Sequence, residues 1–315
     1  MNKVKFFNGL VIAFTLLALP SFSSTAFGAD EVEEVVAVGS RREARSVGDS
    51  PAPVDIITGA DFVNQGAMDL PDMIRTLVPS FNVNTQPISD AATLIRPANL
   101  RGLPPDNMLV LVNGKRRHRG AVISFLGSGI SDGAQGPDIS AIPSIALKQL
   151  EVLRDGASAQ YGSDAIAGIM NFVLRDDSEG TQLEIRSGEY TEGDGAAWRI
   201  AANVGMPFTS SGFANLSIEI QDSEATSRSV QRADAQGLYD GGNTAIWNYP
   251  EPAQIWGSPE VSNDYKFVVN LGLSLDESKD FYLFGNYGER NVLGGFFFRN
   301  PTNRGGVFST DGGVT

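Results

Sequence analysis

From residue 177 onward the sequence alternates apolar and polar residues with a period of two, which predicts β-strands with one apolar and one polar face. Five segments carry the pattern, at residues 182–186, 198–206, 216–221, 269–275 and 281–287. In the first of them Leu183 and Ile185 alternate with Glu184 and Arg186. A transmembrane barrel would turn the apolar face to lipid, whereas a soluble sandwich would bury it. The alternation alone leaves both architectures open.

The lengths of the connections favour the barrel. If the first strand runs outward from the periplasm, the short connections at residues 207–211 and 276–279 lie on the periplasmic side. The long ones, at residues 222–263 and from 291 onward, then lie outside. Short inner turns and long outer loops are typical of outer-membrane barrels. The first outer turn, at residues 191–195, is short and fits this rule less well.

Residues 1–29 have the order of a secretory signal peptide. Two lysines precede an apolar run at residues 10–19, and small residues follow, so we expect cleavage near residues 26–29. The run is half the length of about 20 residues that a spanning helix needs. The mature chain is therefore expected to begin near Ala29, outside the cytoplasm.

Composition excludes several classes of function. With no cysteine there is no disulfide or thiolate site, and with one histidine there is no histidine-cluster metal site. The net charge of −13 argues against a nucleic-acid-binding domain. No cofactor, metal site or enzyme activity is expected, and a hydrolase built on His118 is the weakest alternative.

Residues 30–46 form a short segment and linker ahead of the first folded region. Its β-branched stretch predicts an extended strand too isolated to fold alone. Such a strand is suited to pairing with the sheet edge of another protein, and a disordered leader is the alternative. The stretch comprises Val32, Glu33, Glu34, Val35, Val36, Ala37 and Val38.

Residues 47–176 read as a compact α/β region. Asp69 is a good helix N-cap, the helix runs through Leu77, and Pro79 ends it. Asn113-Gly114 predicts a type I′ hairpin turn. Strands are expected at residues 53–57, 108–112, 149–154 and 169–174.

Two groups of residues are candidates for ligand binding. The basic return limb of the hairpin could bind an anion, although such a run is more often a solvated face. Aromatic residues in the long connection could stack on a sugar or an aryl chelator, although loop packing is the commoner role. The candidates are Arg116, Arg117, His118 and Arg119, and Trp247, Tyr249 and Trp256.

Three stretches resemble the plug domain of TonB-dependent outer-membrane receptors. They are Leu100-Arg101-Gly102, LVLVNGKRR at residues 109–117, and LEVLRDGASAQYGSDAIAGIMNFVL at residues 150–174. The resemblance implies a globular plug inside a 22-stranded barrel and makes residues 32–38 similar to a TonB box. It also implies that Arg101 and Arg154 face barrel glutamates, with Gly102 and Glu151 at the same plug–barrel contact.

The resulting fold expectation is an α+β plug domain followed by the antiparallel strands of an incomplete transmembrane β-barrel. Twenty-two strands of about 9–11 residues would need roughly 200 residues in strands. Residues 177–315 contain five predicted strands. We therefore expect an N-terminal fragment of a longer receptor.

The expected function is TonB-dependent import of a ferric siderophore or similar chelate across the outer membrane of a Gram-negative bacterium. TonB with its inner-membrane energising complex, the nutrient and outer-membrane lipid are the expected partners. A carbohydrate or cobalamin importer of the same family, a passive porin and a secreted β-rich binding protein remain alternatives.

Overall fold

The computed structural model describes residues 35–36, 45–46, 54–83, 92–124, 129–154, 158–244, 246, 256–276, 278–295 and 298–301. All of them belong to one of the two compact units of the chain, Glu34–Thr315. The predicted signal peptide, Trp247, Tyr249 and all of residues 32–38 except Val35–Val36 lie outside the described residues.

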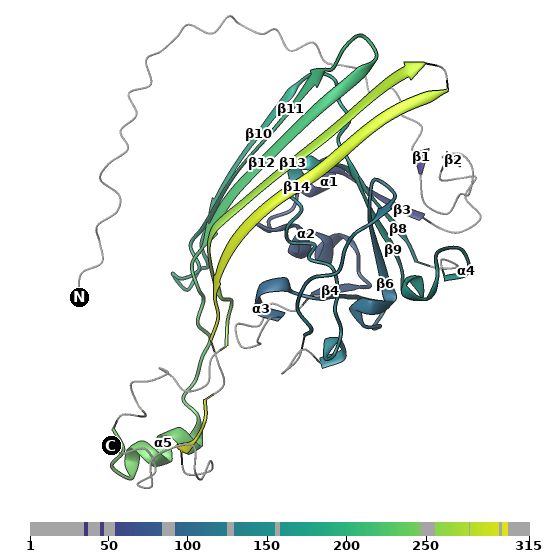
Figure 1. Ribbon diagram of the computed structural model, residues 1–315. Helices are drawn as coiled ribbons and strands as arrows, with labels where there is room; N and C mark the ends of the chain where they lie inside the picture. Colours follow the sequence, from purple (N-terminus) through teal and green to yellow (C-terminus); the bar gives the residue numbers. More distant parts are fainter. Residues whose placement is uncertain are drawn as a thin grey trace, which may run out of the picture. The chain divides into compact units, whose positions relative to one another are not determined.

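A five-stranded mixed sheet organises the first part of the chain, and we call residues 54–176 the α/β region (Figure 1). The sheet has the order β3-β8-β9-β6-β7. Strands β6 and β9 are parallel, and the other pairs are antiparallel. The strands are β3 (Val54–Thr58), β6 (Met108–Val112), β7 (Lys115–Arg116), β8 (Leu147–Leu153) and β9 (Gly168–Leu174). All four strands predicted in this region are confirmed.

Short helices and turns complete the α/β region. They are α1 (Gly59–Val63), α2 (Leu70–Leu77), α3 (Ala92–Ile95), α4 (Ser158–Tyr161) and the 3-10 turns η2 (Pro105–Asn107), η3 (Gly129–Ser131), η4 (Ser144–Ala146) and η5 (Ser163–Ala165). Strand β4 (Phe81–Val83) pairs with β5 (Ala98–Leu100), an unpredicted two-stranded sheet. The helices pack Phe62, Met73 and Ile74 into a core with Leu150 and Phe172 of the main sheet.

Two local predictions are confirmed in detail. The Asp69 carboxylate accepts a hydrogen bond from the Asp72 backbone N–H at 3.0 Å and so caps α2. Asn113 and Gly114 have φ values of 47° and 73°, the two positive angles that a type I′ turn requires. The return limb after this turn forms a strand over Lys115–Arg116, and the Arg117 backbone N–H donates to the Val110 carbonyl at 2.9 Å.

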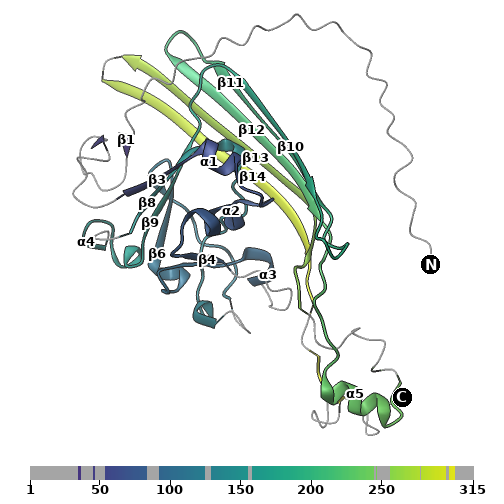
Figure 2. The ribbon, with the colours of Figure 1, turned by 180° about the vertical axis from the view of Figure 1, so that it is seen from behind.

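Five long strands form a second, antiparallel sheet in sequence order, which we call the long-strand sheet (Figure 2). They are β10 (Thr181–Gly188), β11 (Ala197–Pro207), β12 (Gly212–Ser223), β13 (Glu260–Asp276) and β14 (Lys279–Leu293). The long connection between β12 and β13 carries α5 (Ala233–Asp240). A separate short pair joins β1 (Val35–Val36) to β2 (Arg45–Ser46).

The long-strand sheet exposes its apolar face and buries its polar one. Leu183 and Ile185 of β10 are 63% and 70% exposed, whereas Arg199 of β11 and Glu219 of β12 are 0% and 1% exposed. A soluble sandwich would show the opposite polarity, because its inner faces form the apolar core. Polar inside and apolar outside is the arrangement of a membrane barrel wall.

No described helix is long and apolar enough to cross a membrane. The described helices are short, and the longest, α2 and α5, have 8 residues each.

Candidate functional site at the interface of the two sheets

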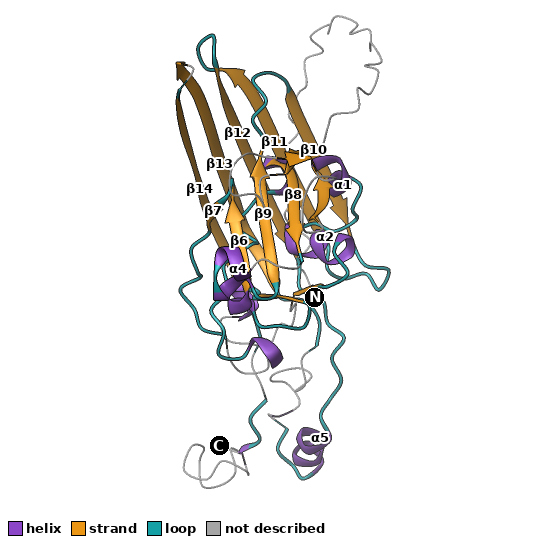
Figure 3. Cartoon of the chain, turned by 90° about the vertical axis from the view of Figure 1, so that its right-hand side faces the viewer, coloured by secondary structure: helices purple, strands orange, loops and turns teal. Residues whose placement is uncertain are grey.

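The α/β region lies against the polar face of the long-strand sheet, and Arg186 of β10 makes one of the contacts that join them (Figure 3). Its guanidinium donates to the backbone carbonyls of Val63 at 2.7 Å and Ala67 at 3.3 Å, and also to those of Phe62 and Gln65. These carbonyls belong to the end of α1 and the turn after it, where a helix leaves its last acceptors unsatisfied. Arg186 therefore connects β10 of the long-strand sheet to the end of α1 in the α/β region.

A buried charge network crosses three neighbouring long strands. Arg199 Nη2 lies 2.8 Å from Glu219 Oε2, and Lys266 Nζ lies 2.7 Å from Glu219 Oε1 and 3.3 Å from Asp264 Oδ2. Arg199 also donates to Ser144 Oγ of η4 at 2.6 Å, so the network reaches the α/β region. Buried charges need partners of this kind, because an unpaired one is costly.

Amide side chains form a further contact. Asn113 at the type I′ turn donates to Asn270 Oδ1 of β13 at 3.3 Å, and Asn270 donates to the Arg175 carbonyl at 2.9 Å. Arg117 donates to Asn286 Oδ1 of β14 at 2.6 Å. The hairpin is thus held against the middle of β13 and β14 rather than beside the long connection.

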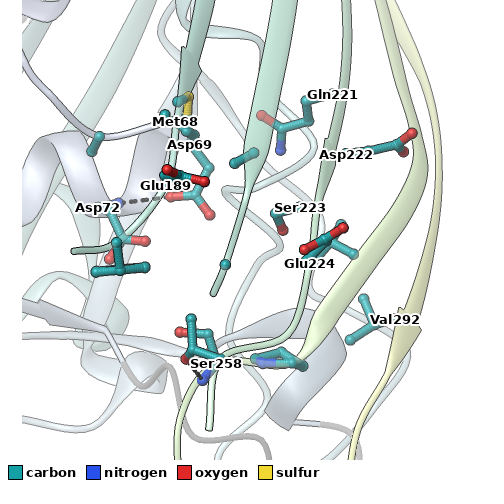
Figure 4. Close-up of a pocket in the computed structure, with 18 of the residues that line it drawn as sticks. Met68, Asp69, Asp72, Glu189, Gln221, Asp222, Ser223, Glu224, Ser258 and Val292 are labelled. Atoms are coloured by element: carbon teal, nitrogen blue, oxygen red, sulfur yellow. Dashed lines mark hydrogen bonds between the residues drawn. The ribbon is translucent and has the colours of Figure 1, made fainter. Parts of the chain in front are cut away.

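A cavity of about 410 Å³ opens between the α/β region and the end of the long-strand sheet that carries the long connection (Figure 4). The α/β region supplies the start of α2 and parts of α3. The long-strand sheet supplies residues where β10, β12 and β14 end and where β11 and β13 begin. A cavity of this size can hold a drug-sized molecule or part of a larger one.

Two carboxylates and one guanidinium of the α/β region line one side of the cavity. Arg96 pairs with Asp69 and, at 3.0 Å, with Asp72. Burial would raise the pKa of Asp69, but the Arg96 charge and hydrogen bonds from Asp72 lower it to about 2. Burial and the neighbouring Asp69 charge raise the pKa of Asp72 to about 6. The cavity lining therefore includes the Asp72 carboxyl group, whose pKa of about 6 lies close to neutral pH.

The residues predicted at the plug–barrel contact lie in two separate places. They are Arg101, Gly102, Glu151 and Arg154. Arg101 is exposed in a turn with Gly102 and donates to the Arg154 carbonyl, while the Arg154 side chain pairs with Asp55 of β3. Glu151 is buried within the main sheet and accepts hydrogen bonds from Gln149 at 2.9 Å and Asn171 at 3.0 Å. Contact of these residues with barrel glutamates stays a prediction.

The predicted ligand residues that the structure describes do not line the cavity. Arg116 pairs with Asp164, and Arg119 lies 3.7 Å from Asp106, so both have partners inside the α/β region. His118 is exposed, and Trp256 is 44% exposed in the long connection. Their role in binding stays a prediction.

Sequence reasoning missed the residues that make the interface. Arg186, Arg199, Glu219 and Lys266 all occupy the polar phase of the alternation, which was the available signal. Charged residues at the inward-facing positions of long strands indicate that a polar partner packs against the inner face of the sheet. Their pairing depends on strand register, which the pattern alone does not supply.

Residues 46–169 match the family model of the TonB-dependent Receptor Plug Domain. The α/β region is therefore a TonB-dependent receptor plug domain. The long-strand sheet, with its apolar face outward, is part of a barrel wall.

Several curated outer-membrane proteins resemble this chain. The vitamin B12 transporter BtuB of Photobacterium profundum is 25% identical over 219 residues, which cover 69% of this chain and 32% of BtuB. The iron-regulated outer membrane virulence protein of Vibrio cholerae is 28% identical over 176 residues, covering 55% and 25%. The ferric enterobactin receptor PirA of Pseudomonas aeruginosa is 30% identical over 160 residues, covering 50% and 21%. The chain thus spans a third or less of these relatives.

Solved structures show the same fold. The ferric enterobactin receptor PfeA of Pseudomonas aeruginosa has a TM-score of 0.57 at 19% identity, over 76% of this chain and 33% of PfeA. The siderophore receptor PirA of Acinetobacter baumannii has a TM-score of 0.54 at 20% identity, over 76% and 32%. At these identities the likeness concerns the fold of the TonB-dependent receptor alone.

Proposed function

We propose that this TonB-dependent receptor imports a ferric siderophore or a similar chelate across the outer membrane. The nutrient enters the cavity between the plug domain and the outer ends of the strands, and TonB supplies the energy that moves the plug. Two of the named relatives are an iron-regulated outer membrane protein and a ferric enterobactin receptor, which supports an iron chelate as cargo.

The observation that carries the proposal is that polar side chains make much of the contact between plug and wall, beside an apolar contact through Val268 and Phe284. Arg186, Asn113 and Arg117 hold the two together by hydrogen bonds to carbonyls and amides. Such bonds can be exchanged for bonds to water at modest net cost, because a neutral bond contributes about 0.5–1.5 kcal/mol and a bond to a charged group about 1.5–3 kcal/mol. An interface of this kind suits a domain that has to shift during transport.

The proposed point of attachment for TonB is residues 32–38. Val35–Val36 pairs with Arg45–Ser46 by antiparallel backbone bonding, so this part of the segment already adopts a strand. A strand of TonB would take the place of Arg45–Ser46 and grip the same backbone groups. The residues on either side would extend the pairing.

Uptake measured in the bacterium that carries the gene tests the proposal. Cells grown under iron limitation should accumulate radiolabelled ferric siderophore, and a protonophore should abolish uptake while leaving surface binding intact. A strain lacking the gene is the control. Accumulation that survives collapse of the proton gradient would instead support a passive porin.

Cobalamin is the second candidate, because the BtuB match covers the largest share of this chain among the named relatives, at 69%. Labelled cyanocobalamin supplied to the same cells separates the two cargoes. Uptake of cobalamin but not of any ferric chelate would replace iron as the cargo and leave the coupled mechanism intact.

A further inference from the structure

The turn between β10 and β11, at residues 189–196, forms part of the rim of the cavity. Tyr190 and Gly195 of the turn line the cavity. Two backbone hydrogen bonds close the turn on itself, from the Tyr190 N–H to the Asp194 carbonyl at 3.0 Å and from the Gly193 N–H to the Tyr190 carbonyl at 2.9 Å. The turn is therefore a compact unit, and a displacement of it would carry Tyr190 along and change the size of the opening.

Arg228, in the connection between β12 and β13, binds this turn through its side chain. Arg228 Nη1 lies 2.5 Å from Asp194 Oδ2, and Arg228 Nη2 lies 3.0 Å from Asp194 Oδ1. Nη2 also lies 3.3 Å from Glu192 Oε2, and the guanidinium carbon lies 5.6 Å from the centre of the Tyr190 ring. The Ser227 N–H donates to Asp194 Oδ2 at 3.0 Å. A bidentate pair fixes orientation as well as distance, so Arg228 positions the turn and the Tyr190 ring.

The part of the connection that carries Arg228 is fixed to the segment that leads into β13. The Thr226 N–H donates to the Ser258 carbonyl at 3.1 Å, and the Ser258 N–H donates to Thr226 Oγ1 at 2.7 Å. The Arg228 N–H donates to the Trp256 carbonyl at 2.6 Å. The turn packs on this support at Gly195, where an added Cβ would lie 2.5 Å from Thr226 Cγ2. Arg228 therefore holds the turn against a paired and fixed segment.

Water reaches the contact between Arg228 and Asp194. Their side chains are 40% and 28% exposed, whereas Arg96, which binds α2, and Arg290, which binds α3, are 10% and 11% exposed. Hydrogen bonding to Arg228 lowers the pKa of Asp194, and hydrogen bonding to Asp194 raises the pKa of Arg228, so both stay charged near neutral pH. An exposed ion pair contributes little to stability and is screened by salt. A ligand can therefore displace the turn more easily than the elements that the buried arginines hold.

We propose that the β10–β11 turn is the movable part of the rim, and that Arg228, by holding it, determines the largest molecule that the cavity admits. Pockets for drug-sized ligands range from about 300 to 1,000 Å³, so the cavity of about 410 Å³ is near the small end. A small molecule enters with the Arg228–Asp194 pair intact, and a bulky cargo enters when the pair breaks and Tyr190 moves away with the turn. The inference rests on the proposed import function, because it names the size of cargo that requires the rim to open.

A single cysteine in the cavity measures its opening without any cargo. Ser223 ends β12 and lines the cavity (Figure 4), and the chain contains no cysteine, so Ser223→Cys supplies a single thiol there. N-ethylmaleimide is a small reagent, and N-(1-pyrenyl)maleimide is a bulky one that is equally uncharged. Both react with the full chain, expressed from its own gene, in isolated outer membranes. The two rates, each divided by the rate with glutathione, give the size selection of the cavity.

Arg228→Gln should admit the bulky reagent more readily. In the Ser223→Cys background we expect it to raise the pyrenylmaleimide rate about two- to fivefold, the effect of losing an exposed ion pair, and to leave the N-ethylmaleimide rate unchanged. Exchanging the charges, with Arg228→Asp and Asp194→Arg together, should restore the parental ratio. Arg232→Gln is the control, because Arg232 is equally exposed in the same connection but pairs with Asp234, and it should change neither rate.

Salt tests whether the contact that holds the rim is electrostatic. Raising the NaCl concentration from about 50 mM to about 500 mM shortens the range of charge interactions severalfold. This change should accelerate pyrenylmaleimide in the parental Ser223→Cys protein and have no effect on its rate in Arg228→Gln. An equal salt effect in the two proteins would show that the Arg228 charge does not hold the rim.

The outcomes separate this inference from the proposed function. A parental pyrenylmaleimide rate in Arg228→Gln, equal acceleration of both reagents, or a charge exchange that fails to restore the ratio overturns the inference. Labelling requires neither cargo nor TonB, so these results do not depend on import. If the predicted labelling is found but the cells accumulate no ferric chelate, the proposed function fails and the role of Arg228 at the rim stands.

Discussion

Lys266 of β13 lies directly opposite Glu219 of β12, and its Nζ approaches Glu219 Oε1 to 2.7 Å with both side chains 2% exposed. This pair is the centre of the charge network that also holds Arg199 and Asp264. The network lies on the inward face, where Arg199 reaches Ser144 of the plug domain. Its integrity therefore affects both the wall and its contact with the plug.

Replacing Lys266 by methionine leaves Glu219 and Asp264 buried with one cation fewer. Removing one partner of a buried ion pair typically costs about 3–5 kcal/mol. We expect Lys266→Met to lower the unfolding midpoint of the detergent-solubilised receptor strongly. Lys279→Met removes an exposed partner of Asp276 and serves as the control, with an unchanged midpoint expected. Equal midpoints for the two variants would show that the network is not needed for stability.

Arg186→Met removes the donors that bind the carbonyls after α1 and keeps the apolar stem. The variant should loosen residues 59–67 without unfolding the wall, because the contact is made at one edge of the plug. Hydrogen exchange of backbone amides in this segment should accelerate about tenfold, as expected for the loss of about 1.4 kcal/mol of local stability. Arg75→Met, at an exposed site on α2, is the control. Unaltered exchange in Arg186→Met would contradict the bridging role.

The Asp69–Asp72 carboxyl pair beside the cavity predicts that the stability of the folded protein depends on pH. The pKa of Asp72 is raised to about 6, so the folded protein favours its protonated form, and this contribution is lost as pH rises through about 6. The pKa of Asp69 is lowered to about 2, so its contribution is present above its ordinary pKa of 3.8 and is lost as pH falls through about 2. The two together predict greatest stability near about pH 4, because Asp69 contributes fully above that pH and Asp72 loses its contribution progressively between about pH 4 and pH 6. Unfolding midpoints measured from about pH 2 to about pH 8, a range that includes both pKa values, test this.

Asp72→Asn supplies a neutral group of the same shape at this position. The variant should lose no stability between about pH 4 and pH 7, where the parent loses roughly 2–3 kcal/mol. The Asp69 contribution at lower pH should be unchanged. A parent and a variant with parallel profiles above pH 5 would rule out Asp72 as the titrating group.

The chain contains no cysteine, so single cysteines can be introduced for labelling without a background. A spin label at Ile218→Cys, which is 46% exposed on the outer face, should collide with lipid-dissolved oxygen. A label at Ser217→Cys, the adjacent residue on the buried face, should be shielded from it. Equal accessibility at the two neighbours would contradict the orientation of the long-strand sheet.

Local features of the fold were predictable from sequence because local chemistry determines them. Asp69 caps α2 through its own side chain, and Asn113-Gly114 tolerates the positive φ angles of its turn. The alternation around Ile185 and Ile218 also separates the apolar face from the polar one correctly, although it does not determine which of the two is exposed. Each of these depends on neighbours within a few residues in the chain.

The interface and the cavity depend on register and on distant segments. Lys266 and Glu219 are 47 residues apart in sequence, and the connection between their strands does not fix which residues face each other. The cavity joins Asp69 of the plug domain with Gln221 of β12, so no single stretch of sequence contains its pattern. The β4–β5 pair was missed because three-residue strands carry too little alternation to detect.

If TonB moves the plug by pairing with residues 32–38, as proposed, Val36→Pro should uncouple binding from import. Proline removes a backbone donor from the strand and should prevent pairing. With the variant expressed from its own locus, binding of radiolabelled ferric siderophore to the cell surface should equal that of the parent, and energy-dependent accumulation should vanish. Accumulation at the parental rate would contradict the account.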